Sequence, residues 1–517
     1  MTENKIIKNI KITIFFVTIF LLTVLFVVVR SEADLDLWHR MAVGKIFSQI
    51  GWVIYHDIFS YFPVKEMWVD HEWLSGVIFY YIINWFGDFG ILTLQILIIF
   101  AILILVYKTN KLIWLENKYR ISYYAVVLLA IIPGLSSTLR CQAFTYLFFT
   151  LWLYLLERIR RGDNRFIWVF PVTTLLWANM HGGFLAGFGL IGFYIIGDFF
   201  NKKDVKKYFV ILGLSLPMTL LNPYGIKYWY YLVDAVLMER PYITEWQAFE
   251  PFESIYNEPG AKLLFLFLTV GYGYKIFRKQ FGFDKVEIIT LLITLFLLFR
   301  HERHTTFFAI AAACYGYRYF VAFLDAIFDK FRNKVLKLIP EDRIEQAYFA
   351  KYCGVYVLLI MISGYLIFSN HISVKMDMYP VKAVEFIRKN NISGNLFVPF
   401  NWGSYTMWKL YPKNLVSIDG RYEETYESQS YLDVCYLSFF KKDWEKVLNK
   451  YNHDALLLGV ETEIYKKIKT LPEWKLVYED EKAVVFLPAL SKRADWQMPV
   501  EDEEYYIKTK YENQISF

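Results

Sequence analysis

The chain has 517 residues, of which 56% are hydrophobic and 20% aromatic, and its formal net charge is +6. Apolar runs of about twenty residues recur, and that length crosses the roughly 30 Å hydrocarbon core of a bilayer. This composition excludes an ordinary soluble enzyme. The short basic clusters between the runs also lack the continuous basic surface that nucleic-acid binding needs. The sequence therefore predicts an α-helical polytopic membrane bundle.

The apolar segments predict about eleven membrane spans. The first, over residues 10–29, has a basic flank but no small-residue cleavage site, which favours a retained anchor over a removed signal. Residues 73–87 are apolar but short, so we predict a re-entrant or interfacial helix there. The other spans are predicted at residues 89–107, 121–137, 141–157, 166–180, 183–200, 208–221, 261–277, 286–299, 305–324 and 352–369.

Clusters of lysine and arginine predict the orientation of the bundle. They lie in the loops at residues 108–120, 158–165, 201–207, 275–285 and 326–351. Because cytoplasmic loops carry an excess of positive charge, these loops are predicted to face the cytoplasm, as is the N-terminus. Counting residues 73–87 as a further span would place all of them outside, so the charge pattern argues against that count.

The opposite, extracytoplasmic face collects most of the other ionisable side chains. The first outer loop, residues 30–72, carries paired acids and a concentration of histidines, and short turns on the same face add arginines. Such a gathering on one side of a membrane bundle indicates a functional site. Its predicted substrate-binding residues are His71, Glu72, Arg140, His181, Glu245, Arg300 and Arg303. Their alternative roles are helix capping, snorkelling to the membrane interface, or solvation in a turn.

Asp34 and Asp36 are the predicted catalytic residues. On an extended segment, residues two apart project to the same side, so the two carboxylates could bind Mg²⁺ or Mn²⁺ together with phosphate oxygens. One of them could instead act as a general base. If the following segment is an amphipathic helix, the two carboxylates diverge, only one is functional, and capping of that helix is the alternative. No Gly-rich phosphate-binding loop occurs, so no nucleotide cofactor is expected.

From about residue 377 the composition becomes that of a water-soluble domain. Predicted strands at 395–400, 414–420, 453–460, 474–480 and 483–488 alternate with helices, which indicates a small α/β domain over residues 377–494. It follows an odd number of spans in the module of residues 1–372, so it is predicted to lie outside. An acidic tail follows at 495–517.

A loop of this domain, within residues 417–428, leads to a separate prediction. The stretch SIDGRYEETYES places Asp419, Arg421 and Glu423 directly after a predicted strand, where α/β sheets bind ligands. We predict that the loop packs on the first outer loop, that Arg421 pairs with a carboxylate there, and that it helps to close the acceptor site. A solvated loop is the ordinary alternative.

Several motifs together carry a family resemblance: DLDLWHRMAVGKIF, HDIFSY, WVDHEW, LLWANMHGGF, LNPYG, TEW and VSIDGRYE. The chain resembles a group of bacterial membrane proteins assigned to the GT-C glycosyltransferases, a superfamily that includes protein O-mannosyltransferases and lipid A aminoarabinose transferases. The resemblance implies a polyprenyl-phosphate sugar donor and an acidic base in the first outer loop, often with a divalent cation. Only Asp34 and Asp36 match that position. WVDHEW stands where aminoarabinose-type transferases carry a Lys-Pro-Pro-type motif.

The predicted function is sugar transfer at the outer face of a bacterial cytoplasmic membrane. The donor would be a polyprenyl-phosphate sugar, and the acceptor a lipid, glycan or protein of the cell envelope; membrane lipids are further partners. A transporter or flippase for lipid-linked substrates is one alternative, and a non-catalytic envelope assembly protein is another. Transporters often show inverted repeats and place ionisable groups near the bilayer midplane. Here no repeat is found, and those groups fall at the ends of the predicted spans.

Overall fold

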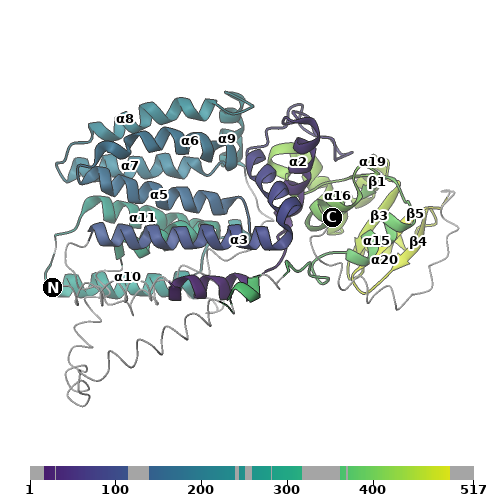
Figure 1. Cartoon of the computed structure of the whole chain (residues 1–517). Helices are drawn as coiled ribbons and strands as arrows, with labels where there is room; N and C mark the ends of the chain where they lie inside the picture. The colour runs from purple at the N-terminus through teal and green to yellow at the C-terminus, as the bar shows by residue number, and fades with distance from the viewer. Residues whose placement is uncertain are drawn as a thin grey trace, which may run out of the picture.

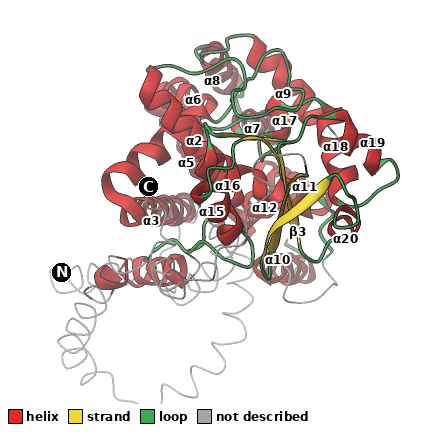
Figure 2. Cartoon of the chain, turned by 90° about the vertical axis from the view of Figure 1, so that its right-hand side faces the viewer, coloured by secondary structure: helices red, strands yellow, loops and turns green. Residues whose placement is uncertain are grey.

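A computed structural model describes residues 17–29, 31–113, 139–238, 244–250, 259–280, 282–316, 361, 363–367 and 371–489. Figure 1 shows two parts side by side, a bundle of long helices and a smaller domain built around a sheet. Helix α2 (Leu35–Ile50) lies between them. Seen from the side of the smaller domain, α2, α16 (Phe400–Leu410) and α17 (Tyr422–Thr425) lie in front of the bundle helices (Figure 2).

The bundle helices follow most of the predicted spans. They are α3 (Trp73–Ile113), α5 (Gln142–Arg160), η1 (Asn164–Trp168) with α6 (Val169–Met180), α7 (Phe184–Phe200), α8 (Lys206–Ser215) with η2 (Leu216–Leu220), α10 (Pro259–Phe277), α11 (Lys285–Arg300), η4 (Glu302–His304), α12 (Thr305–Ala311) and η5 (Ala312–Gly316). Among the described helices, α3 alone has both the length and the hydropathy to cross a membrane by itself. The predicted span at 121–137 lies outside the described residues, as do parts of those at 10–29, 305–324 and 352–369.

A break at Gly87 divides α3 into two helices. Its φ of 57° and ψ of −151° lie outside the helical region, and glycine adopts such a conformation without a steric penalty. The first half packs on α2 so closely that a Cβ atom on Gly44 would lie 2.4 Å from the Gly76 carbonyl oxygen. The short helix predicted at 73–87 is therefore separate from the helix that follows it.

The two ends of the bundle differ in chemistry. At one end, the Arg160 guanidinium joins Asp198 at 2.8 Å and Asp284 at 2.6 Å, which ties α5, α7 and α11 together beside the basic loops. At the other end lie the start of α5, the turn between α6 and α7, and the turn after α11, where α9 (Lys227–Leu237) and η3 (Thr244–Trp246) also lie. The basic loops at residues 158–165 and 201–207 and the predicted site residues are thus at opposite ends of the described bundle.

The smaller domain has a five-stranded sheet of order β2-β1-β3-β5-β4. Strands β2, β1 and β3 are parallel, whereas β5 is antiparallel to both β3 and β4. The strands are β1 (Gly394–Phe397), β2 (Asn414–Val416), β3 (Ala455–Gly459), β4 (Trp474–Glu479) and β5 (Ala483–Pro488), all at predicted positions. The remaining helices are α15 (Val381–Lys389), α18 (Ser428–Ser438), α19 (Trp444–Lys450) and α20 (Glu463–Ile468). Helices α9 and α16 were not predicted.

The first outer loop is built into this domain. The Val416 amide donates to the Phe59 carbonyl at 2.9 Å, and the Lys65 amide donates to the Thr425 carbonyl at 2.8 Å, so the loop extends the sheet beyond β2. Phe62 is buried in the same apolar core as Phe397 on β1. The smaller domain, called the outer domain below after its predicted side, and the first outer loop therefore share one hydrophobic core.

Phe62→Ala is expected to destabilise the outer domain. Truncation of a buried phenylalanine leaves a cavity and costs about 3–5 kcal/mol of unfolding free energy. The matched control is Phe439→Ala, because Phe439 is 61% exposed in the same domain. Thermal unfolding of the detergent-solubilised protein should show a lower Tm for Phe62→Ala only. Equal Tm values for both variants would contradict the shared core.

Cysteine labelling tests the predicted orientation. We expect a membrane-impermeant maleimide to label Glu463→Cys, which lies on the exposed face of α20, in intact cells. Lys203→Cys lies at the basic end of the bundle and should react only after permeabilisation. Both variants also carry Cys353→Ser, because Cys353 lies outside the described residues. The other cysteines, Cys141, Cys314 and Cys435, are buried and can stay. The reverse labelling pattern would show that the orientation is wrong.

Candidate active site

A cavity of about 340 Å³ lies where the end of the bundle, α2 and the outer domain meet. Ionisable side chains dominate its walls. They include Asp36, His39, Arg40, His71, Glu72, Arg140, Glu245, Arg303, Glu423 and Glu424. The structure thus brings together most of the predicted site residues from segments far apart in the sequence.

Asp34 caps α2, and both of its carboxylate oxygens are engaged. One oxygen accepts a hydrogen bond from the Asp36 amide at 2.9 Å, and the other accepts from Arg140 Nε at 2.7 Å. Asp36 lies in the first turn of the helix, 4.0 Å from Arg140 Nε, and its side chain is 39% exposed. The helical alternative is therefore the correct one, and Asp36 is the member of the pair that lines the cavity.

The surroundings of Asp36 favour its neutral form. Partial burial raises the pKa of its carboxyl to about 7, and the nearby charges of Asp34 and Glu245 act in the same direction, while Arg140 opposes them. A carboxylate with a pKa near the working pH can accept a proton and release it again. Asp36 therefore has the properties of a general base.

Two arginines line the cavity together with Asp36, and both donate to the carboxylate of Glu245. Arg140 Nη1 donates to Glu245 at 3.0 Å, and Arg303 Nη1 donates to the other oxygen of Glu245 at 3.4 Å. The Arg303 guanidinium also lies 5.1 Å from the Trp246 ring. Glu245 thus holds two guanidinium groups at the cavity, where they can meet phosphate oxygens. Arg300 is exposed at the end of α11 and does not line this cavity, so the prediction that it belongs to the site is not supported.

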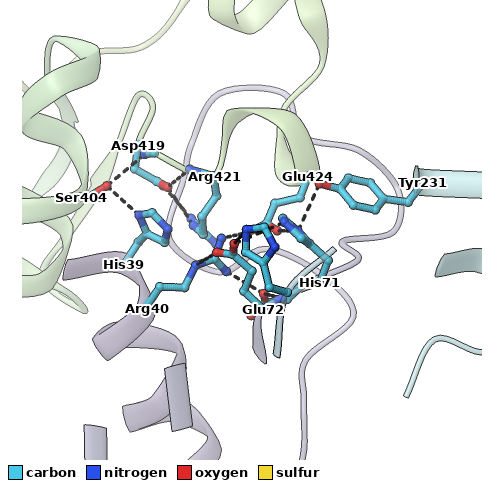
Figure 3. A network of polar contacts seen from close by, with 12 residues as sticks. His39, Arg40, His71, Glu72, Tyr231, Ser404, Asp419, Arg421 and Glu424 are labelled. Atoms are coloured by element: carbon cyan, nitrogen blue, oxygen red, sulfur yellow. Dashed lines mark hydrogen bonds and ion pairs between the residues drawn. The ribbon is translucent and has the colours of Figure 1, made fainter. Parts of the chain in front are cut away.

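Arg40 organises a buried cluster of carboxylates (Figure 3). Its guanidinium lies 2.6 Å from Asp70, 2.7 Å from Glu72 and 3.2 Å from Glu424. Removal of one partner from such a buried ion pair leaves an uncompensated charge, which costs several kcal/mol. Arg40 and Glu424 were not among the predicted site residues, although both stand within the quoted motifs or directly after them.

The histidines beside this cluster differ in charge. His71 Nδ1 lies 2.7 Å from Glu424 and 3.1 Å from the Tyr231 hydroxyl. Burial opposes a charge on His71, but Glu72 and Glu424 outweigh burial and raise its pKa. His181 lies 3.1 Å from Glu72, and burial lowers its pKa to about 3, so it is neutral. The Gly183 amide donates to His181 Nδ1 at 2.7 Å, which places the ring proton on Nε2, the nitrogen nearer Glu72.

Arg421 forms the predicted pair with the first outer loop. Its Nη1 donates to Asp57 at 2.7 Å, and its Nε and Nη2 donate to Asp419 at 2.8 and 2.6 Å. The rings of Phe59 and Trp68 lie 4.8 and 4.6 Å from the guanidinium carbon, and the side chain is fully buried. Because protein carboxylates take these donors, Arg421 fixes the loop and is not positioned to bind a substrate directly.

The residues present do not fit a metal site that uses both predicted aspartates. The Arg140 guanidinium binds Asp34 and approaches Asp36, so it stands where a bridging cation would have to lie. Within the described part of the chain, no three histidine, cysteine, aspartate or glutamate side chains gather as metal ligands.

Comparison of the coordinates with solved structures reveals the same fold in known glycosyltransferases. The oligosaccharyltransferase of Archaeoglobus fulgidus matches 94% of this chain and 75% of its own, with a TM-score of 0.52 and 12% identity. ArnT from Cupriavidus metallidurans matches over 92% and 97%, with a TM-score of 0.53 and 11% identity. The mycobacterial arabinofuranosyltransferase AftD matches over 92% and 40%, with a TM-score of 0.52 and 10% identity. No protein-family model and no curated sequence matches the chain.

Stability measurements should separate the two aspartates. Asp34→Ala removes a helix cap, which costs about 1 kcal/mol, and also the partner of Arg140, so its Tm should fall. The folded state already disfavours the charged form of Asp36, so at pH 8 Asp36→Asn should leave the Tm unchanged or raise it. An equal loss of Tm in both variants would show that Asp36 also has a structural role.

Proposed function

We propose that this protein, which has the GT-C glycosyltransferase fold, is an integral membrane enzyme that transfers a sugar from a polyprenyl-phosphate donor to a cell-envelope acceptor. The observation that carries the proposal is the position of Asp36. Its carboxyl lines the same cavity as Arg140 and Arg303 at an end of the helix bundle, and its surroundings raise its pKa to about 7. The site lies on the extracytoplasmic side in the orientation predicted from the basic loops.

Asp36 would act on the acceptor. Its carboxylate accepts the proton of an acceptor hydroxyl while that oxygen forms a bond to the anomeric carbon of the donor sugar. The bond between the anomeric carbon and the phosphate oxygen breaks, and its electron pair stays on the phosphate. The transition state has oxocarbenium character, which a nearby carboxylate stabilises.

Arg140 and Arg303 would act on the leaving phosphate. Negative charge on the phosphate increases as the bond breaks, and guanidinium groups held in advance stabilise that charge without reorganisation. Glu245 provides this preorganisation, since it contacts both arginines. Arg140 also contacts Asp34, the N-cap of α2. This ion pair fixes the proposed phosphate site relative to the helix that carries Asp36.

The placement of the cavity suits a lipid-linked donor. Helices of the bundle expose large apolar side chains, including Phe199, Leu292 and Phe296, as expected for lipid-facing surfaces. The polyprenyl chain can remain among lipids while its phosphate reaches the end of the bundle, where the arginines lie. The transporter alternative predicts ionisable groups near the bilayer midplane, whereas the groups of this cavity gather at one end.

Asp36→Asn is expected to abolish sugar transfer. Loss of a general base costs about 10²–10⁴-fold in rate, and the amide keeps the shape of the side chain. Glu463→Gln is the control, because Glu463 is exposed on α20 away from the cavity. Each variant is expressed in a deletion strain, and the envelope glycans are quantified by mass spectrometry. Wild-type glycan levels with Asp36→Asn would refute the catalytic assignment.

The initial rate of transfer should rise with pH through about 7. Below that value the Asp36 carboxyl is protonated and cannot accept the acceptor proton; above it the carboxylate is available. Purified protein is assayed with membranes of the deletion strain as the source of donor and acceptor, at constant ionic strength. A rate that is independent of pH between 5.5 and 8.5, about 1.5 units on either side of this pKa, would contradict a proton transfer to Asp36.

A further inference from the structure

The cavity has two walls of different chemistry. The wall formed by α2 and the bundle carries Asp36, Arg140 and Arg303, which suit the reacting centre and the phosphate. The opposite wall belongs to the outer domain. It consists of the first residues of α16, the turn at residues 420–421, and α17. Asp57 and Asp419 take the donors of Arg421, so the wall presents aromatic, amide and carboxylate groups to a ligand.

Aromatic rings on the outer-domain wall are fixed in place. The rings of Phe400 and Tyr422 lie 5.4 Å apart at an interplanar angle of 79°. Tyr431 packs against both of them, at 5.7 Å from Phe400 and 5.4 Å from Tyr422. Both Phe400 and Tyr422 are partly exposed at the cavity, so each presents an apolar surface to a ligand.

Polar groups accompany these rings. The Tyr422 hydroxyl donates to the Glu423 carboxylate at 2.7 Å, which orients that carboxylate beside the ring. Asn401 lies next to Phe400 at the start of α16, and its side chain is exposed. An amide offers both donors and an acceptor, and a carboxylate offers acceptors, so the pair can satisfy neighbouring hydroxyl groups.

His39 adds a buried donor between the walls. The Gly420 amide donates to Ser404 Oγ at 3.0 Å, which leaves the Ser404 hydroxyl hydrogen available to His39 Nδ1 at 3.1 Å. That arrangement places the ring proton on Nε2, which has no hydrogen-bond partner within the described part of the chain. His39 is 1% exposed and lines the cavity, so an unpaired N–H there indicates a ligand acceptor atom.

We propose that the outer-domain wall is the acceptor subsite and that the acceptor is a carbohydrate. A sugar ring would pack its C–H face on Phe400 and Tyr422 while its hydroxyl groups pair with Asn401, Glu423 and His39. This inference rests on the proposed transferase function and narrows its acceptor to a glycan. One hydroxyl of that glycan gives its proton to Asp36, and its oxygen takes the donor sugar from the phosphate.

Other acceptor classes match this wall less well. Strand addition of a peptide requires a sheet edge, whereas this wall consists of the start of α16, a turn and α17. An aliphatic acceptor would offer no polar partner to the Asn401 amide and the His39 N–H, which both line the cavity, at a cost in free energy. A polyhydroxylated ring satisfies both the aromatic and the polar groups.

Photo-crosslinking in cells identifies the class of the occupant. Asn401 is replaced by p-benzoylphenylalanine in the full-length protein, with the same replacement of Glu463 as the control. After irradiation and trypsin digestion, we expect the peptide that contains residue 401 to carry masses of saccharide units, and the control peptide to carry none. A peptide adduct at residue 401, or no adduct above the control, would overturn the proposal.

Binding of undecaprenyl phosphate separates this inference from the proposed function. The full-length protein in nanodiscs should bind this lipid, and Arg140→Gln should weaken binding about tenfold or more, the range for loss of a charge-assisted contact. Phe400→Leu should leave lipid binding unchanged while lowering sugar transfer about tenfold, as expected for a lost aromatic contact. Failure of the wild type to bind the lipid would refute the transferase proposal. Lipid binding together with a peptide adduct would refute only the carbohydrate acceptor.

Discussion

Burial of the Arg421 guanidinium is the constraint on which the rest of the site depends. A charge without contact with water is tolerated only when carboxylates and hydrogen bonds compensate it, and Arg421 obtains them from Asp57 and Asp419. One of these partners belongs to the outer domain and the other to the first outer loop. Docking of the domain is therefore required for the stability of this charge, and docking brings Glu424 to Arg40 and Ser404 to His39.

The buried charge of Arg40 is compensated in the same way at the cavity. Three carboxylates converge on one guanidinium, and His71 adds a further positive charge beside Glu424. Their mutual attraction holds three segments together: α2, residues 70–72 and α17. Asp36 lies one helical turn before Arg40, so the cluster also fixes its position. Asp36 keeps a raised pKa and is not itself one of the carboxylates that bind Arg40. Because Asp36 is outside the Arg40 cluster, a change in its protonation state does not break the ion pairs of that cluster.

Local patterns in the sequence predicted the elements better than their contacts. All five strands were located because their apolar runs are bounded by turn residues, and the two bundle ends were separated by the distribution of lysine and arginine. Helix α16 was missed because FNWGSYTMWKL is rich in aromatic and small residues and follows a proline. The pairing of Arg421 with a loop carboxylate was predicted, but Arg40 was not, since a basic residue within an amphipathic helix gives no sign of burial. Which of Asp34 and Asp36 faces the cavity depended on the exact start of α2, a detail set by the cap geometry.

Packing of the first outer loop into the core of the outer domain also limits how early this part of the chain can fold during synthesis. Asp57 and Arg421 are 364 residues apart. At synthesis rates of about 5–20 residues per second, roughly 20–70 s therefore pass between synthesis of the loop and synthesis of the residues that pair with it. During that interval Phe59 and Phe62 are already outside the bundle, with their apolar rings exposed beside an unpaired backbone edge. The loop has to avoid aggregation over this period, and a ribosome that stops before β1 would release a bundle whose cavity lacks the wall formed by the outer domain. Completion of the cavity is therefore one of the last events in the folding of this chain.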